Sequence, residues 1–429
     1  MQDAAPRLRS LVEQLLGAPL PLRVRAWDGS EAGPPAAPVL VFRNRRALRR
    51  LLWKPGELGL ARAWVAGDLG IEGDLYTALD LLSGTVWERA EDARGPVAAL
   101  RDPEARAAVR GLVRMAGSPL PPAPPAEEVR RRRHLHTRRS DRRAISHHYD
   151  VGNDFYEIVL GPSMVYSCAY WEEGGTLEEA QRDKLELVCR KLALEPGRRL
   201  LDVGCGWGSM ALHAARDHGV RVVGVTLSQE QAAYARKRVA DEGLTDRVEI
   251  RVQDYRDVTD GPYDAISSIG MAEHVGAERY LEYAEVLGGL LEPGGRLLNH
   301  QIARRPQRDE SSYSVDEFID AYVFPDGELA PLGTTVTQLE RAGFEVRDVE
   351  ALREHYALTL RRWVANLEAG WPRAVRLTGA GRARVWRLYM AASAVAFERN
   401  QIGVNQVLAV KTSGGSGGSG MPLRARTWN

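Results

Sequence analysis

Hydrophobic positions recur at two periods along the first 117 residues, and this pattern predicts both helices and strands. Residues 21–43 hold short apolar runs around a Gly/Pro loop, which predicts strands and a turn. Helical patterns flank the glycine-rich stretch 67–74, so we expect a small α+β domain over residues 1–117. Five apolar residues near the start have helical spacing and predict an amphipathic helix that faces the core. They are Leu8, Leu11, Val12, Leu15 and Leu16.

From residue 145 onward, apolar runs alternate with helical stretches. This alternation is typical of α/β proteins with a mostly parallel sheet and helices on both faces. The predicted strands are Arg199–Val203, Arg221–Thr226, Val248–Val252, Tyr263–Ser268 and Arg296–Gln301.

Composition shifts predict the domain boundaries. A proline-rich and then arginine-rich linker, 118–143, separates residues 1–117 from a catalytic domain over 144–411. The Gly/Ser-rich tail, 412–429, has the composition of a flexible linker.

The net charge of +1 in 429 residues leaves only local patches to attract charged partners. The segment Arg130–Arg143 holds eight arginines and one aspartate, a formal charge of +7. This run is either a solvated face or a contact with an anionic membrane surface. No aromatic residues lie within it to stack on bases, so we expect no nucleic-acid partner. Of the 58 basic residues only five are lysines, which we attribute to a GC-rich genome.

The three cysteines, Cys168, Cys189 and Cys205, are too few and too scattered for a disulfide framework or a Cys-x-x-Cys metal site. We therefore expect no metal and a reducing, cytoplasmic location. The sequence has neither a secretory signal pattern nor an apolar run of about 18 residues. A membrane contact would thus be peripheral, at the inner face of the membrane.

A glycine-rich turn is the sharpest local signal. The predicted strand 199–203 runs into Gly204-Cys205-Gly206-Trp207-Gly208, preceded by Asp202. A dinucleotide-binding loop would have Gly-x-Gly-x-x-Gly spacing to seat a pyrophosphate on a helix N-terminus. The Gly-x-Gly-x-Gly spacing resembles instead the first motif of the S-adenosylmethionine (SAM) methyltransferases.

The next two strand ends offer further candidate cofactor ligands. No carboxylate follows the strand 221–226, but Gln231 lies where its amide can bond ribose hydroxyls; the alternative is a solvent-facing glutamine. Asp254, after Gln253, can accept from the adenine amine; the alternative is an ordinary helix N-cap.

Seven blocks of sequence together resemble the cyclopropane-fatty-acyl-phospholipid synthases and the related mycolic acid cyclopropane synthases, over residues 145–411. Residues 1–117 resemble the lipid-associated domain of longer members. The blocks are His147–Val151, Tyr166–Trp171, the glycine turn, Thr226–Ser228, Ser268–Gly276, Asn299–Ile302 and His355–Leu360.

The resemblance implies a fold and two sets of site residues. The fold would be a seven-stranded SAM-methyltransferase domain behind the α+β domain. The residues lining the SAM site would be Tyr166, Ser167, Asp202, Gly204, Gly206, Thr226, Leu227, Gln231, Gln253 and Asp254. The residues holding a bicarbonate ion would be Cys168, Glu273, His300, Ile302 and Tyr356, with Cys168 and Ile302 acting mainly through backbone groups.

Each of the five bicarbonate-site residues also has an ordinary structural interpretation. Cys168 alone would pass as a buried thiol, Glu273 and His300 as a buried pair, and Tyr356 as a core tyrosine. The family often has Thr at the position of Gln301 and Phe at that of Ala272, which leaves the geometry near the reacting carbons open.

The implied activity is methyl transfer from SAM to the cis double bond of an unsaturated acyl chain in a phospholipid. The resulting carbocation, stabilised by aromatic faces such as those of Tyr170, Trp171 or Tyr356, would lose a proton to bicarbonate. Direct ring closure gives a cyclopropane, and a preceding hydride shift gives a methylene, the precursor of a 10-methyl branch. The sequence leaves both products open.

The acyl chain would reach the site through an apolar tunnel. We also expect a homo-oligomer and, for a methylene product, a reductase partner. The competing hypotheses are a methyltransferase of soluble small molecules and a non-catalytic lipid-binding protein.

Overall fold

The computed structural model describes residues 3–84, 103–118, 120–129, 151–310, 313–325, 327–412, 418–424 and 426. The arginine-rich run and the block His147–Asp150 lie outside these residues. The chain divides into two compact units. The first unit contains Met1–Arg131, Asp316–Val323 and Thr378–Val395, and the second contains Arg132–Val315, Phe324–Leu377 and Ala396–Asn429.

The first unit is built on a four-stranded sheet of order β2-β1-β3-β4, in which β1 and β3 are parallel and the other pairs antiparallel. The strands are β1 (Arg23–Arg25), β2 (Glu31–Ala32), β3 (Val39–Phe42) and β4 (Leu69–Glu72). The described helices within residues 1–131 are α1 (Ala4–Leu16), α2 (Arg45–Trp53), α3 (Glu57–Val65), α4 (Leu75–Leu82) and α7 (Pro103–Ala116). The α+β expectation is confirmed.

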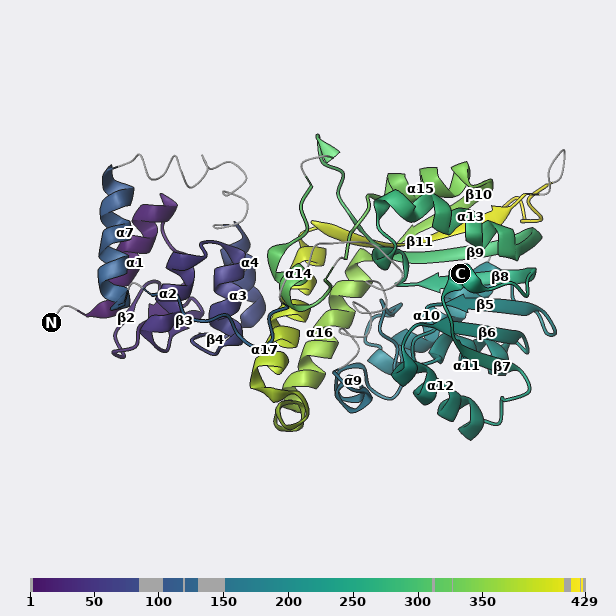
Figure 1. Ribbon diagram of the computed structural model, residues 1–429, viewed down its shortest axis with the longest axis horizontal. Helices are drawn as coiled ribbons and strands as arrows, with labels where there is room; N and C mark the ends of the chain where they lie inside the picture. Colours follow the sequence, from purple (N-terminus) through teal and green to yellow (C-terminus); the bar gives the residue numbers. More distant parts are fainter. Residues whose placement is uncertain are drawn as a thin grey trace. The chain divides into compact units, whose positions relative to one another are not determined.

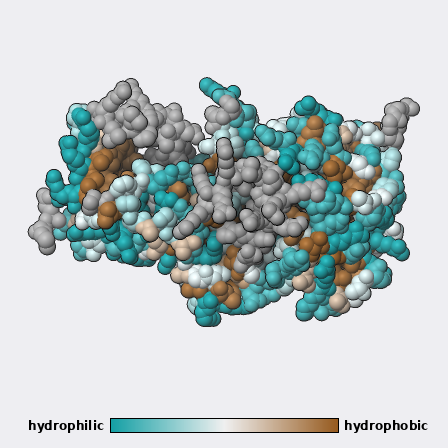
Figure 2. Space-filling view, in the orientation of Figure 1, coloured by the Kyte–Doolittle hydropathy of each residue, from teal (hydrophilic) through white to brown (hydrophobic). Residues whose placement is uncertain are grey.

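The predicted amphipathic helix is α1. Its residue Leu8 is buried in a core with Val24 of β1, the preceding Leu22 and Leu112 of α7, whereas Leu15 is exposed. Figure 2 shows the visible face as mostly hydrophilic, with apolar residues gathered over the region of α1 and α7.

The second unit contains a seven-stranded sheet of order β10-β11-β9-β8-β5-β6-β7 (Figure 1). Strand β11 is antiparallel to both of its neighbours, and the pairs from β9 to β7 are parallel. All five predicted strands are confirmed. The strands are β5 (Arg199–Val203), β6 (Arg221–Thr226), β7 (Val248–Val252), β8 (Tyr263–Ile269), β9 (Leu291–Arg304), β10 (Phe344–Ala351) and β11 (Ile402–Lys411).

Helices cover both faces of this sheet (Figure 1). One apolar layer joins the sheet to α10 (Leu177–Leu192), α11 (Ser209–Asp217) and α12 (Gln229–Asp241). The other layer joins it to α13 (Tyr280–Leu290) and α15 (Leu332–Arg341). Both layers are needed because parallel strands are apolar on both sides.

The remaining elements are short helices and the long C-terminal pair. Helix α17 is interrupted at Gly379, whose φ of 80° is non-helical. None of the described helices is both long and apolar enough to cross a lipid bilayer. The elements are α9 (Asn153–Leu160), η2 (Tyr255–Asp257), η3 (Ala272–His274), η4 (Ala277–Arg279), α14 (Glu317–Tyr322), α16 (Arg353–Ala369) and α17 (Trp371–Glu398).

Candidate active site

The glycine turn between β5 and α11 forms one wall of a pocket. Gly204, Gly206 and Gly208 have φ values of 78°, 54° and 83°, a region that side chains with a Cβ disfavour. A Cβ on Gly208 would lie 3.1 Å from that of Ala235 in α12. The turn therefore needs glycine both for its backbone and for close packing of α11 on α12.

All ten predicted cofactor residues line this one pocket. They come from the segment before α10, from the glycine turn, and from the carboxyl ends of β6 and β7. Ligands of open α/β sheets bind at this edge, where loops follow the strands. The structure thus gathers residues that span Tyr166 to Asp254 around a single cavity.

Two charged groups lie deep in the pocket. The Asp202 carboxylate accepts a hydrogen bond from Ser267 Oγ at 2.8 Å, and burial raises its pKa to about 6. The Lys184 ammonium donates to Ser167 Oγ at 3.0 Å, and burial lowers its pKa to about 8. Lys184 is a pocket residue that the sequence analysis missed.

The side chains at the end of β6 bond one another. Thr226 Oγ1 donates to Gln231 Oε1 at 2.9 Å, and Ser228 caps α12 by accepting from the Gln231 N–H at 3.2 Å. Gln231 is therefore buried against the pocket, and the alternative of a solvent-facing glutamine is wrong.

At the end of β7, Asp254 caps η2 by accepting from the Arg256 N–H at 3.0 Å. Its carboxylate also forms an ion pair with the Arg256 guanidinium at 2.6 Å. Gln253 Nε2 donates to the Asp257 carbonyl at 2.7 Å. Asp254 therefore combines the N-cap geometry with a place in the pocket wall.

Three of the five predicted catalytic residues meet at the carboxyl end of β9. Glu273 Oε1 accepts a hydrogen bond from the Ile302 N–H at 2.8 Å, so this backbone donor is already engaged. Glu273 Oε2 and His300 Nε2 are buried without a hydrogen-bond partner among the described residues. The Gly270 N–H, from the pocket wall, donates to the His300 carbonyl at 2.9 Å.

Burial perturbs both titratable groups at this strand end. It raises the pKa of Glu273 to about 7, against a bond from the Ile302 N–H that lowers it. It also holds the pKa of His300 well below its ordinary value, helped by the charges of Lys184 and Lys191. His300 is therefore neutral, and Glu273 titrates near neutral pH.

A buried polar chain behind His300 fixes which ring nitrogen carries its proton. Gln406 Oε1 accepts from the Lys191 ammonium at 2.8 Å, and Lys191 is also paired with Glu350. Because an ammonium only donates, the Gln406 amide must direct its NH2 group to His300 Nδ1, 3.3 Å away. His300 Nδ1 accepts, so the proton lies on the unpartnered Nε2.

The other two predicted catalytic residues, Cys168 and Tyr356, are connected to the end of β9 by hydrogen bonds of Leu352. The Cys168 thiol donates to the Leu352 carbonyl, with a sulfur–oxygen distance of 3.6 Å, and burial raises its pKa. The Leu352 N–H donates to the carbonyl of Val404, the residue that faces Ile302 across the β9–β11 ladder. Tyr356 is buried against Trp363 and Phe397, with ring centroids 6.0 and 4.8 Å away.

The five predicted catalytic residues do not line the cofactor pocket itself. The other two suggested aromatic residues do not line it either. Tyr170 stacks on His355 at 4.9 Å, and Trp171 Nε1 donates to Thr359 Oγ1 at 3.0 Å.

The two positions that depart from the family pattern do not line this pocket either. Gln301 bonds Tyr280, Asn299 and Thr335, on the face of β9 opposite to His300. Ala272 is buried in the apolar layer beside α13.

Comparison with known proteins places these observations in a family. The sequence profile described as "Mycolic acid cyclopropane synthetase" matches residues 136–407. The chain is 47% identical over 418 residues to a probable fatty acid methyltransferase of Mycobacterium tuberculosis, covering 94% of each protein. It is 40% identical over 261 residues to the cyclopropane-fatty-acyl-phospholipid synthase of Escherichia coli, covering 61% of this chain and 66% of that protein.

Solved structures of the same kind superpose on the chain. The cyclopropane synthase MmaA2 from Mycobacterium tuberculosis has a TM-score of 0.60 and 32% identity, covering 65% of this chain and all of that one. The mycolic acid cyclopropane synthase CmaA1, complexed with SAH and CTAB, has a TM-score of 0.60 and 34% identity, covering 63% of this chain and 98% of that one.

Proposed function

Because the chain belongs to the mycolic acid cyclopropane synthetase family of SAM-dependent methyltransferases, we propose that it methylates the cis double bond of an unsaturated acyl chain, such as oleoyl, in a phospholipid. The observation that carries this proposal is that two buried polar atoms, Glu273 Oε2 and His300 Nε2, have no hydrogen-bond partner among the described residues, while Gly270 of the pocket wall bonds the His300 backbone carbonyl. Methyl transfer to a carbon–carbon double bond requires a base, because a proton must then leave carbon.

The ten pocket residues would hold SAM, whose sulfonium supplies an electrophilic methyl group. Gln231 and Asp254 lie at the strand ends where ribose and adenine groups would bind. Lys184, a buried cation that bonds Ser167 and interacts electrostatically with Asp202, would also attract the carboxylate of the cofactor. Trp207, Met164 and Ile269 supply apolar parts of the pocket wall.

His300 and Glu273 together offer a bicarbonate ion one hydrogen-bond donor and one acceptor. His300 presents an Nε2–H donor, and Glu273 Oε2 is an acceptor when ionised. A bound bicarbonate would supply the base that removes a proton from carbon. Gln406 and Lys191 would act as positioning residues by keeping the His300 proton on Nε2.

The cyclopropane and the methylene remain two outcomes of the proposed reaction. Both pass through the same cation and use the same residues. The names of the relatives support both, since they include a cyclopropane synthase and a fatty acid methyltransferase. A methylene product would require a reductase partner to give the methyl branch.

The test is mass spectrometry of lipids after incubation of the protein with methyl-labelled SAM and oleoyl phospholipid, with and without bicarbonate. We expect a gain of one CH2 unit that depends on bicarbonate, and fragmentation then separates ring from branch. Glu273→Gln should abolish the gain while SAM binding persists. Labelled soluble acceptors without labelled lipid would refute the proposal in favour of a small-molecule methyltransferase, and SAM binding without turnover would favour a binding protein.

A further inference from the structure

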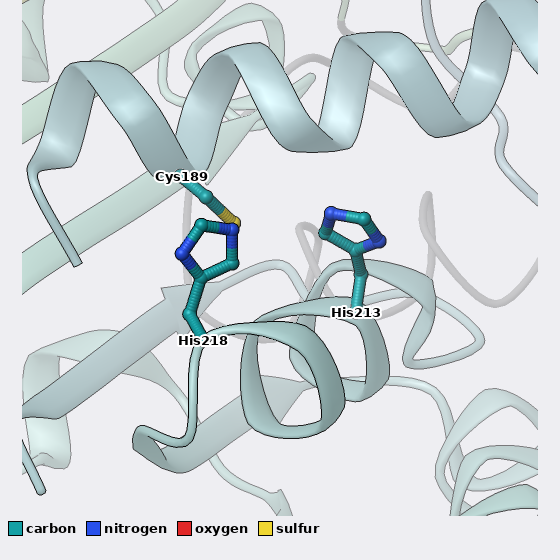
Figure 3. Close-up of side chains that lie close together, drawn as sticks. All are labelled: Cys189, His213 and His218. Atoms are coloured by element: carbon teal, nitrogen blue, oxygen red, sulfur yellow. The ribbon is translucent and has the colours of Figure 1, made fainter. Parts of the chain in front are cut away.

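Three side chains of metal-binding type converge between α10 and α11, away from the cofactor pocket. They are Cys189 of α10, His213 of α11 and His218, the residue that caps the end of α11. Each offers a ligand atom, and these atoms all lie within 4.8 Å of one another. In Figure 3 the two imidazoles rise from α11 and its end toward the thiol of Cys189.

A carboxylate completes the group. Glu186 lies one helical turn before Cys189, so both side chains project from the same face of α10. Its Oε2 atom is 2.9 Å from His218 Nε2 and 3.2 Å from His213 Nε2. Arg190 holds the other carboxylate oxygen at 2.7 Å, which orients Oε2 toward the two rings.

A further carboxylate lies behind His213. Asp217 Oδ2 lies 2.9 Å from His213 Nδ1 and can accept a hydrogen bond from it, which would leave Nε2 to bind a metal ion. A carboxylate behind a histidine in this way is typical of metal sites.

We propose that Glu186, Cys189, His213 and His218 bind a divalent transition metal of the Zn²⁺ class. Thiolate and imidazole ligands select such ions over Mg²⁺ and Ca²⁺. Ligand atoms of a tetrahedral zinc site lie about 3.3–3.8 Å apart, so the spacing of Cys189, His213 and His218 needs side-chain shifts of about 1 Å or less. The thiolate and the carboxylate together neutralise the charge of the ion.

Metal binding would release a proton from Cys189, and the ion must reach the site from solvent. A thiol must lose its proton to form a sulfur–metal bond, so binding releases a proton to solvent and affinity rises with pH. Side chains of Glu186 and His218 are 30% and 18% exposed, which gives the ion access from solvent.

The site is structural in character. Four protein ligands close a tetrahedral shell and leave no position for substrate. None of the four residues lines the cofactor pocket. The ion would tie α10, which carries Lys184, to α11, which follows the glycine turn, and the inference is independent of the proposed reaction.

Cobalt substitution tests the site in the full-length protein. After chelator treatment and desalting, Co²⁺ alone is added, and the near-ultraviolet absorption of a thiolate–cobalt bond is recorded. We expect about one equivalent of bound Co²⁺, displaced by Zn²⁺, with this band present. Cys189→Ser should remove the band, whereas Cys205→Ser, a change at another buried thiol, should retain it.

A second variant keeps the test informative if Cys189→Ser does not fold. Asp217→Ala leaves the four ligands intact but removes the acceptor behind His213, so metal affinity should fall about 10- to 100-fold in competition with a chelating dye. Cobalt binding without a thiolate band, affinity unchanged in both variants, or no stoichiometric binding would each overturn the proposal and leave a metal-free histidine–carboxylate cluster.

Discussion

Replacing Gln406 with glutamate should reverse the tautomer of His300. Gln406 lies between the Lys191 ammonium and His300 Nδ1, and the substitution changes its shape very little. A carboxylate at this position has only acceptors, and the ammonium 2.8 Å away keeps it ionised. The His300 ring would then place its proton on Nδ1, and Nε2 would lose the hydrogen that it presents to bicarbonate.

The magnitude follows from the hydrogen bond that is created. A hydrogen bond to a charged group contributes about 1.5–3 kcal/mol. Each 1.36 kcal/mol corresponds to a factor of ten, so the Nε2–H tautomer falls about 10- to 150-fold in Gln406→Glu, and kcat with it. Gln406→Met removes both hydrogen bonds but biases neither nitrogen, so the productive tautomer falls only about twofold.

The relative effects of the two substitutions show whether Gln406 sets the tautomer of His300 or only stabilises the fold. If Gln406 merely stabilised the fold, methionine, which loses both contacts, would be at least as harmful as glutamate. Gln301→Met is the matched control, because it removes another buried amide, from the opposite face of β9. It should lower stability without changing the His300 tautomer.

Two measurements together decide the question. Single-turnover transfer of labelled methyl to oleoyl phospholipid gives the rate, and long-range proton–nitrogen correlation spectra of histidine-labelled protein give the tautomer. His300→Gln assigns the signal among the nine histidines. An Nδ1–H tautomer in the unmodified protein, or a methionine variant slower than the glutamate variant, would refute the reasoning.

Four further predictions concern other parts of the chain. Lys184→Met should weaken SAM binding about 10- to 150-fold by calorimetry yet stabilise the free protein below pH 8, since burial lowers the pKa of this lysine. Ionisation of Glu273, whose pKa is raised to about 7, should make kcat rise through neutral pH. The free energy of unfolding should fall between about pH 4.5 and 7, because in this range the carboxyl is already ionised in the unfolded chain but still protonated in the folded protein. Glu273→Gln should remove this fall. Gly208→Ala should cost about 1–2 kcal/mol in urea unfolding, with the unhindered Gly289→Ala as control. Neutralising Arg130–Arg143 should abolish salt-sensitive binding to anionic liposomes, and unchanged binding would exclude this run as the membrane contact.

The parts of the fold that the sequence predicted are those with a local signal. The five predicted strands of the second unit are rich in apolar residues, and three glycines at positive φ mark the turn after β5. Strand β4 was not predicted, because Gly67, Gly70 and Gly73 interrupt its pattern. It forms nonetheless because Leu69 and Ile71 pair with β3 and pack in the core.

Two site residues that the sequence analysis did not predict, Lys184 and Lys191, are both lysines in a chain that has few of them. Lys184 and Lys191 are two of only five lysines, and both are buried. We attributed the scarcity of lysine to genome composition, but that explanation does not say why these two positions have lysine and not arginine. Each ammonium fits a compact site as a point charge, where the broad guanidinium of arginine would not.

Contacts between distant segments explain why the remaining site residues had no local signal. His300 and Gln406 are 106 residues apart, and Lys191 and Gln406 are 215 apart. They meet because β11 inserts antiparallel between β9 and β10, which sets Gln406 directly opposite His300 in the ladder. A shift of one residue in that register would turn Gln406 to the other face of the sheet. The chemistry proposed for His300 therefore depends on strand order and register, and variants that disturb the β9–β11 pairing should change its tautomer even where no site residue is altered.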